Sequence, residues 1–216
     1  MSPPAAKTGR AARTRDALIR AGRELFAERP VDAVAIDDIV RQADVAKGSF
    51  YNHFVDREAL VRTITDEIRQ ELELAVDAAN DGVEDPARRV ARAVCVYQRY
   101  AIDAPLSTRV LLRVPSGFAN LSGPRNRGLM TDITEGLARG RFVIATQEAG
   151  MLFVMGASQA ALARTSRDPQ AALAISLAQQ MCALLLRGLG VPTGESDVIA
   201  AQAADEIVRR GAAAAP

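Results

Sequence analysis

The sequence predicts an all-α fold of about nine to ten helices, with a small N-terminal three-helix domain before a larger helical domain. Apolar residues recur three and four positions apart along almost the whole chain, which is the spacing of one helix face. Alanine, the strongest helix former, is abundant. No run of alternating apolar and polar residues is long enough to indicate a strand. With 49% hydrophobic residues among 216, the chain has ample material for a core.

Residues 36–60 hold the pattern around which the small domain is organised. A first short helix carries one apolar stripe at i, i+3, i+4 and i+7, formed by Ile36, Ile39, Val40 and Ala43. Asp44 then breaks the pattern, because aspartate tolerates the left-handed backbone that a tight turn needs. Val45 follows and is placed to fill the corner between two helices.

A second short helix is predicted from Lys47 to Phe54. Phe50 and Phe54 lie one turn apart and should be buried. The opposite face carries hydrogen-bonding groups, one aromatic hydroxyl and a glycine: Lys47, Gly48, Ser49, Tyr51, Asn52 and His53. A polar exposed helix after a tight turn is typical of the helix-turn-helix, whose second helix enters the major groove of DNA.

Helices before and after this pair complete the predicted domain. A helix from about Thr14 to Glu28 is ended by Pro30. Asp56 is expected to cap a long helix that runs to about Asn80. The predicted core consists of Leu18, Leu25, Phe26, Ile36, Ile39, Val40, Val45, Phe50 and Phe54.

The segment Val34–Leu60 resembles the DNA-binding signature of the tetracycline-repressor (TetR) family, most clearly in the stretch DVAKGSFYNHFVDREAL. The matching positions are Val45, Lys47, Gly48, Phe50, Tyr51, Phe54, Glu58 and Leu60. Two positions depart from the family pattern. Ala35 stands where Ser or Thr usually caps the first helix, and Asp44 stands where Gly usually forms the turn. More loosely, the stretch LLLRGLGVP resembles the close of the family's C-terminal domain.

Seven residues are predicted to contact DNA. Lys47 can reach guanine O6 and N7 from the start of the second helix; the alternative is a solvated lysine near a helix start, where a cation is mildly unfavourable. Gly48 would let the backbone approach the duplex, unless it is a simple helix start. The resemblance implies phosphate or base contacts for Ser49, Tyr51 and Asn52, and phosphate contacts for His53 and Arg57. Tyr51 has an alternative role as a half-buried edge residue.

The charge of the chain is unevenly placed. Net charge is only +1, but up to residue 23 six cationic residues face a single aspartate, a local charge of +5. We therefore divide the chain into a disordered basic arm (residues 1–12), a helix-turn-helix DNA-binding domain (13–55) and a helical ligand-binding and dimerisation domain (56–211). The last assignment follows from the resemblance.

Further helices are predicted over residues 86–104, 106–114, 126–145, 147–166, 168–190 and 196–210.

The two long C-terminal helices suggest a homodimer. Small residues recur at helical spacing on the predicted helix over residues 147–166, and apolar residues recur at helical spacing on the predicted helix over residues 168–190. The predicted interface residues are Gly156, Ala160, Leu177, Met181 and Leu184. The same pattern also fits a bundle within one chain.

Aromatic residues and methionines on the middle helices are candidates for an effector pocket, which the resemblance implies for this region. They are Tyr97, Tyr100, Phe118, Met130, Phe153 and Met155. Each of them taken singly is equally compatible with ordinary core packing.

Other functional classes find little support in the sequence. Cys95 and Cys182 share no metal-ligand spacing and are expected to be buried thiols, and the lone His53 has no partner for a metal or for acid–base work. Asp37 and Asp38 suit the first turn of a helix better than a catalytic pair. We expect no metal, no cofactor and no enzymatic activity. The most apolar stretch, Leu173–Leu189, is too short and too polar to span a bilayer, which predicts a cytoplasmic protein.

The sequence therefore predicts a ligand-responsive transcriptional regulator, more specifically a repressor, that binds a palindromic operator in double-stranded DNA as a homodimer and responds to an unknown small-molecule effector. The alternative is a helical protein–protein interaction module that does not bind DNA. The exposed polar face of the second short helix favours DNA.

Overall fold

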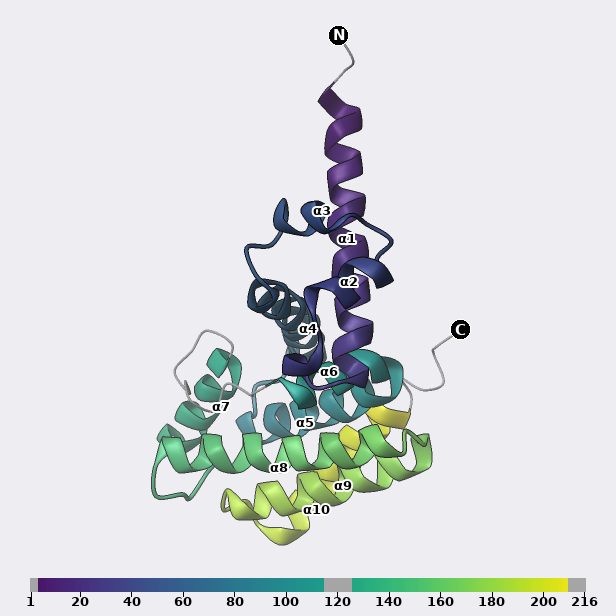
Figure 1. The fold of residues 1–216 in the computed structure, drawn as a ribbon. Coiled ribbons are helices and arrows are strands. Elements are labelled where there is room, and N and C mark those ends of the chain that lie inside the picture. Colours follow the sequence, from purple (N-terminus) through teal and green to yellow (C-terminus); the bar gives the residue numbers. More distant parts are fainter. Residues whose placement is uncertain (1–3, 115–125, 210–216) are drawn as a thin grey trace. The chain divides into compact units, whose positions relative to one another are not determined.

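The computed structural model describes residues 4–114 and 126–209, and these residues form helices and connections without a strand. This confirms the all-α prediction. The helices are α1 (Pro4–Glu28), α2 (Ile36–Gln42), α3 (Lys47–Tyr51), α4 (Arg57–Asn80), α5 (Pro86–Asp103), α6 (Pro105–Arg113), α7 (Arg127–Ala138), α8 (Gln147–Arg167), α9 (Ala171–Gly188) and α10 (Thr193–Ala203) (Figure 1). A 3-10 turn (Val31–Ala33) precedes α2, and a π-helical segment (Ala204–Arg209) follows α10.

The chain divides into two compact units, and α4 and α6 each run from one into the other. The first unit contains residues 1–69 and 109–115, and the second contains residues 70–108 and 116–216. The first unit extends past residue 55, the predicted end of the helix-turn-helix domain, because the first turns of α4 pack on α1. A Cβ added to Gly22 of α1 would lie 2.8 Å from Cδ1 of Ile64, so the two helices approach closely.

The predicted core of the first unit is largely confirmed. Seven of its nine residues are buried: Leu18, Leu25, Phe26, Ile39, Val40, Phe50 and Phe54. Ile36 and Val45 are only half-buried. Leu60, Ile64 and Ile68 of α4 complete this core without exposed surface. Burying one such side chain contributes roughly 1.5–3 kcal/mol, so packing against α1 and α4 fixes the position of the short helices.

Helix α1 begins at Pro4, ten residues before its predicted start at Thr14. The described part of the predicted disordered arm is therefore helical. The segment after Pro4 is rich in Ala, Lys and Arg, which favour helix, and proline is tolerated in a first helical turn. The prediction of disorder relied on the lack of an apolar stretch and on the cationic residues, whereas helix propensity favours continuing the helix towards the N-terminus.

Helix α3 ends at Tyr51, earlier than the predicted end at Phe54. Residues 52 and 53 form a turn in which the backbone N–H groups of His53 and Phe54 both donate to the carbonyl of Phe50, each at 2.9 Å. Asp56 caps α4 as predicted, because its Oδ1 accepts from the backbone N–H of Ala59 at 2.6 Å.

The second unit is a helical bundle centred on α5. In this unit α5 packs against α7, α8, α9 and α10, while α8 and α9 run alongside each other (Figure 1). Its core is built from aliphatic and small side chains, including Val90, Val94, Ile133, Leu185 and Leu186. Cys95 and Cys182 are buried free thiols, as predicted, but their sulfur atoms lie 3.7 Å apart, a proximity that their separation of 87 positions in the sequence did not indicate.

Helix α7 ends at Ala138, seven residues before its predicted end. Gly140 has a φ of +64°, which stops the helix, and the ring of Phe142 then lies against Gly136, where a Cβ would be 2.0 Å from the ring. Arg141 ties this connection to two acidic residues, with bonds of 2.9 Å to Asp85 and 2.7 Å to Glu195. Helix α9 likewise begins at Ala171, after the predicted start at Asp168.

Helix α9 is long and apolar enough to cross a membrane by length and composition alone, and 33% of it is buried. A core helix of a soluble protein satisfies the same criterion. In the second unit α9 buries Ala174, Ala178, Cys182, Leu185 and Leu186 against its neighbours.

Candidate nucleic-acid interface

The position of α3 is fixed by two phenylalanines, Phe50 on its inner side and Phe54 just after its end. Phe50 is fully buried and its ring centroid lies 5.7 Å from that of Phe54 and 5.5 Å from that of Tyr51, which meets it edge-on. The guanidinium of Arg15 on α1 lies 5.6 Å from the Phe54 ring centroid, a cation–π distance. A five-residue helix has little stability of its own, so these contacts hold it in place.

The turn between α2 and α3 has the predicted geometry. Asp44 has a φ of +53°, and no other non-glycine among the described residues has a positive φ. The backbone N–H of Val45 donates to the carbonyl of Val40 at 3.0 Å, which closes the turn. Ala35 offers no side-chain cap to α2, but Asp38 accepts from the backbone N–H of Ala35 at 3.4 Å. The departures at both positions therefore leave the motif intact.

The outer side of α3 and the turn after it are polar and accessible. Lys47, Gly48, Tyr51 and Asn52 are exposed, and Tyr51 keeps 53% of its surface. Ser49 and His53 are half-buried. A Cβ added to Gly48 would meet nothing within 4 Å, so the chain itself does not require glycine there. The structure thus brings six of the seven predicted DNA-contacting residues to one short, continuous segment.

Lys47 is held by an acidic neighbour on α2. Its ammonium lies 2.7 Å from Oδ1 of Asp37, and both side chains are more than half exposed. The hydrogen bond to Asp37, and then the charge of that carboxylate, raise the pKa of Lys47. Lys47 stays cationic at neutral pH, and an exposed ion pair of this kind contributes little stability, so it does not prevent the ammonium from contacting another anion.

Arg57 has a different environment from the other six residues. Its Nη1 donates to the backbone oxygens of Asp32 and Val34 at 3.2 and 3.3 Å, and its Nη2 lies 2.8 Å from Oε1 of Glu58. Its side chain is only 22% exposed. The guanidinium therefore ties the connection between α1 and α2 to the start of α4, a role that the sequence did not reveal.

The first part of the chain matches a known family model. Residues 18–64 match the model described as "Bacterial regulatory proteins, tetR family". The chain is also 37% identical, over 77 residues, to the HTH-type transcriptional repressor DhaR of Mycobacterium sp. (strain GP1), a match that covers 35% of this chain and 39% of that repressor. The chain thus matches well under half the length of this curated relative.

Solved structures extend the likeness to both units. The crystal structure of RolR without ligand is 28% identical with a TM-score of 0.64, covering 86% of this chain and 95% of that one. The helix-turn-helix segment of this chain is thus similar to that of TetR-family regulators. The RolR complex with resorcinol gives 28% identity and a TM-score of 0.60. FadR from Bacillus halodurans, at 17% identity and a TM-score of 0.66, shares the fold.

The predicted effector-binding residues that the structure describes are spread over α5, α7 and α8. Tyr97, Tyr100, Met130 and Met155 are half-buried in the second unit, and Tyr100 donates from its hydroxyl to Glu71 at 2.7 Å. Phe118 lies outside the described residues. Phe153 is 43% exposed and its ring covers Gly188 of α9, because position 153 falls on the same outer stripe as positions 156 and 160.

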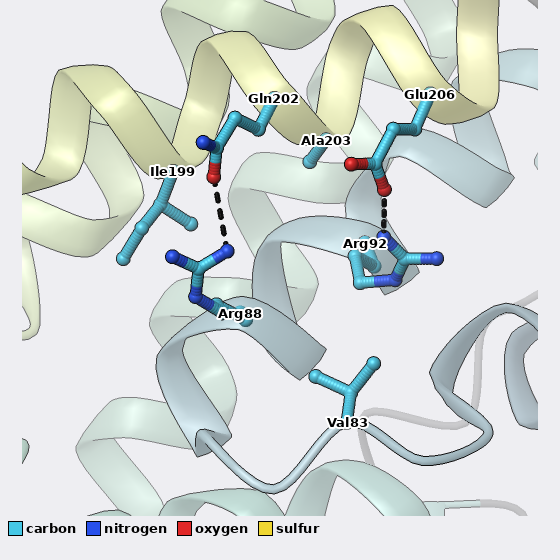
Figure 2. A pocket seen from close by; sticks show the side chains of 7 residues that line it. All are labelled: Val83, Arg88, Arg92, Ile199, Gln202, Ala203 and Glu206. Atoms are coloured by element: carbon cyan, nitrogen blue, oxygen red, sulfur yellow. Dashed lines mark hydrogen bonds and ion pairs between the residues drawn. The ribbon is translucent and has the colours of Figure 1, made fainter.

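Two hollows in the second unit have other linings. The smaller, about 60 Å³, is bounded by Val83, Arg88, Arg92, Ile199, Gln202, Ala203 and Glu206 (Figure 2). There Arg88 donates to Gln202 at 2.9 Å and Arg92 pairs with Glu206. A wider, open hollow is bounded by Asn80, Gly82, Val83, Glu84, Arg89, Glu135 and Arg139. Of the predicted effector-binding residues that the structure describes, none lines either of these hollows.

The predicted interface residues share the accessible side of α8 and α9. Gly156, Ala160 and Leu184 are exposed, and Leu177 and Met181 are half-buried. A Cβ at Gly156 would meet nothing within 4 Å. Leu152 and Phe153 are also exposed there, which makes an unusually apolar surface for a protein exterior. These two residues were not among the predicted interface residues, although they lie one turn before Gly156 at helical spacing.

Proposed function

We propose that this chain is a cytoplasmic transcriptional repressor of the TetR family that binds a palindromic operator as a homodimer and releases it when a small molecule binds the second unit. Its known relatives are regulators rather than enzymes, and we propose no catalytic role for it. The observation that carries the proposal is the polar exposed segment from Lys47 to His53, held on a buried Phe50–Phe54 pair.

Direct contact with DNA is proposed for Lys47, Gly48, Ser49, Tyr51, Asn52 and His53. The segment offers hydrogen-bond donors, one hydroxyl-bearing ring and an unobstructed glycine, which suits a phosphate backbone and base edges. A surface that docks protein would instead show exposed Leu, Phe or Met at its centre. For Arg57 we propose mainly a supporting role, because its guanidinium already binds two backbone carbonyls.

Dimerisation is proposed through the outer side of α8 and α9. Five exposed or half-buried apolar residues and two small ones share this side, and a palindrome read by two α3 helices requires a twofold axis. Exposed Leu152 and Leu184 would lose contact with water in such a dimer.

The effector is proposed to be a small, mainly apolar molecule. RolR, 28% identical, has been solved with resorcinol, so resorcinol is the first compound to test on this chain. Effector binding would shift α4, which runs from one unit into the other, and so change the spacing of the two α3 helices. A coupling of about 1–3 kcal/mol would weaken operator binding roughly 5–150-fold.

Selection of bound fragments from random duplex DNA tests the central proposal. We expect the full-length protein to enrich a palindrome, and Lys47→Ala to relax the preference at particular base pairs. Arg164→Ala is the matched control, because it removes one exposed cation from the second unit and should leave the preference unchanged. Enrichment of no sequence, or an equal effect of both variants, would overturn DNA recognition by this segment.

A further inference from the structure

A buried glutamine in the second unit has an unfilled hydrogen-bonding position. Gln98 on α5 and Thr165 on α8 are both fully buried. The hydroxyl of Thr165 donates to Oε1 of Gln98 at 2.6 Å, whereas Nε2 of Gln98 has no hydrogen-bond partner among the described residues. Folded proteins rarely keep a desolvated donor without a partner, so this amide calls for a further group.

The buried residues one helical turn from Gln98 and from Thr165 are apolar. One helical turn away on α5 lie Val94 and Ala101, and one turn before Thr165 on α8 lie Ala161 and Leu162, all of them buried. An ionised ligand would lose its hydration here without gaining an opposite charge. An apolar lining around one placed polar group is instead typical of a site for a neutral small molecule.

The hydrogen-bonding groups of the Gln98 amide further restrict the class of ligand that fits. As it stands, Nε2 of Gln98 needs an acceptor. Rotating the amide by 180° would let Nε2 donate to Thr165 and would leave Oε1 in need of a donor. A hydroxyl group both donates and accepts, so it satisfies Gln98 in either orientation.

We propose that Gln98 is the polar anchor of the effector site and that it takes a neutral, mainly apolar molecule carrying a hydroxyl, such as a phenol. This inference rests on the proposed function and specifies where its effector binds. Because Gln98 is enclosed between α5 and α8, admitting a ring requires these two helices to separate locally. Effector binding is thereby coupled to the arrangement of helices in the second unit.

Phenol and toluene test this directly, since the two rings differ only in a hydroxyl in place of a methyl. Titration calorimetry on the full-length protein, without DNA, should show phenol binding about 10-fold tighter than toluene. Gln98→Met keeps the length of the side chain and removes the amide, so the ratio should fall to about one. Ser196→Ala is the control, because it removes another buried hydroxyl, which donates to the carbonyl of Val191 at 3.1 Å, and should keep the ratio.

A second measurement does not depend on any variant. In crystals of the wild-type protein with 4-bromophenol, the anomalous signal of bromine should place the ring beside α5 with its oxygen on the Gln98 amide. Water alone at the amide, a ring bound elsewhere, or equal ratios for wild type and Gln98→Met would overturn the proposal. Phenol binding at Gln98 without release of operator DNA would refute the proposed ligand response while leaving the site itself supported.

Discussion

Replacing Arg57 with alanine tests whether this residue stabilises the first unit or contacts DNA. Its guanidinium binds the backbone oxygens of Asp32 and Val34, which belong to the connection between α1 and α2, and the carboxylate of Glu58. Without the Arg57 guanidinium, the carbonyl of Val34 loses a hydrogen-bond donor in a region where water has limited access. We therefore expect Arg57→Ala to destabilise the first unit.

The two backbone bonds account for most of the expected loss. The carboxylate of Asp32, also within reach at 3.4 Å, belongs to a side chain that is 98% exposed and adds little. A hydrogen bond to a charged group contributes about 1.5–3 kcal/mol, and partial exposure of the guanidinium reduces the expected cost of the substitution to about 1–2 kcal/mol. For a chain of this size each kcal/mol shifts Tm by about 2–4 °C, so we expect a fall of about 2–8 °C.

Differential scanning calorimetry and a salt titration of DNA binding together separate the two roles. Arg62→Ala is the control, because its side chain is 65% exposed and its ion-pair partner Asp56 is 3.9 Å away, so the expected change is below about 0.5 kcal/mol. If Arg57 acts inside the unit, the slope of log affinity against log salt should change by less than one. An unchanged Tm with a slope reduced by about two per dimer would refute this role and show a phosphate contact on each protomer.

Three further substitutions have expected outcomes. Phe50→Ala should cost about 3–5 kcal/mol in chemical denaturation and abolish DNA binding, with Phe50→Leu intermediate, because the ring is fully buried. Leu184→Glu should give monomers in sedimentation analysis, whereas the equally exposed Leu74→Glu should not. Burial raises the pKa of Asp85. The hydrogen bonds that this carboxylate accepts from Arg141 and from the backbone of Ala87, together with the charge of Arg141, have a larger combined effect and lower the pKa overall. Stability from this pair is therefore present above about pH 4 and lost as pH falls further, so Asp85→Asn should flatten the acid limb of a Tm profile.

The helix-turn-helix was predictable because its determinants are local. The spacing of apolar residues placed Phe50 and Phe54 inside, and the conformational tolerance of aspartate identified Asp44 as the left-handed turn residue. Asp56 was recognisable as a cap from its position before a long apolar stripe. Each of these features depends on fewer than ten consecutive residues.

Helix ends and side-chain partners were less predictable, because they depend on contacts between distant segments. Helix α7 ends where Phe142 folds back over Gly136, and nothing in the local sequence specifies that contact. Arg57 has the position of a phosphate contact in the family pattern, but its partners are backbone carbonyls that precede it by more than twenty residues. The sequence shows that position 57 carries a hydrogen-bond donor, but it does not show which acceptors the fold places beside that donor.

The effector-site candidates show most clearly the difference between features set by local sequence and features set by contacts between distant segments. Aromatic rings and methionines mark apolar surface but not the place where a ligand needs a partner, and Phe153 proved to be exposed. Gln98 carried a better signal, since it interrupts the inward stripe formed by Val90, Val94 and Ala101 on α5. Only the structure shows that Thr165, 67 residues away, satisfies one end of its amide and leaves the other open. A polar residue within an apolar stripe is thus a sharper pointer to a binding site than a cluster of large apolar ones, because its burial has a cost that some further group must offset.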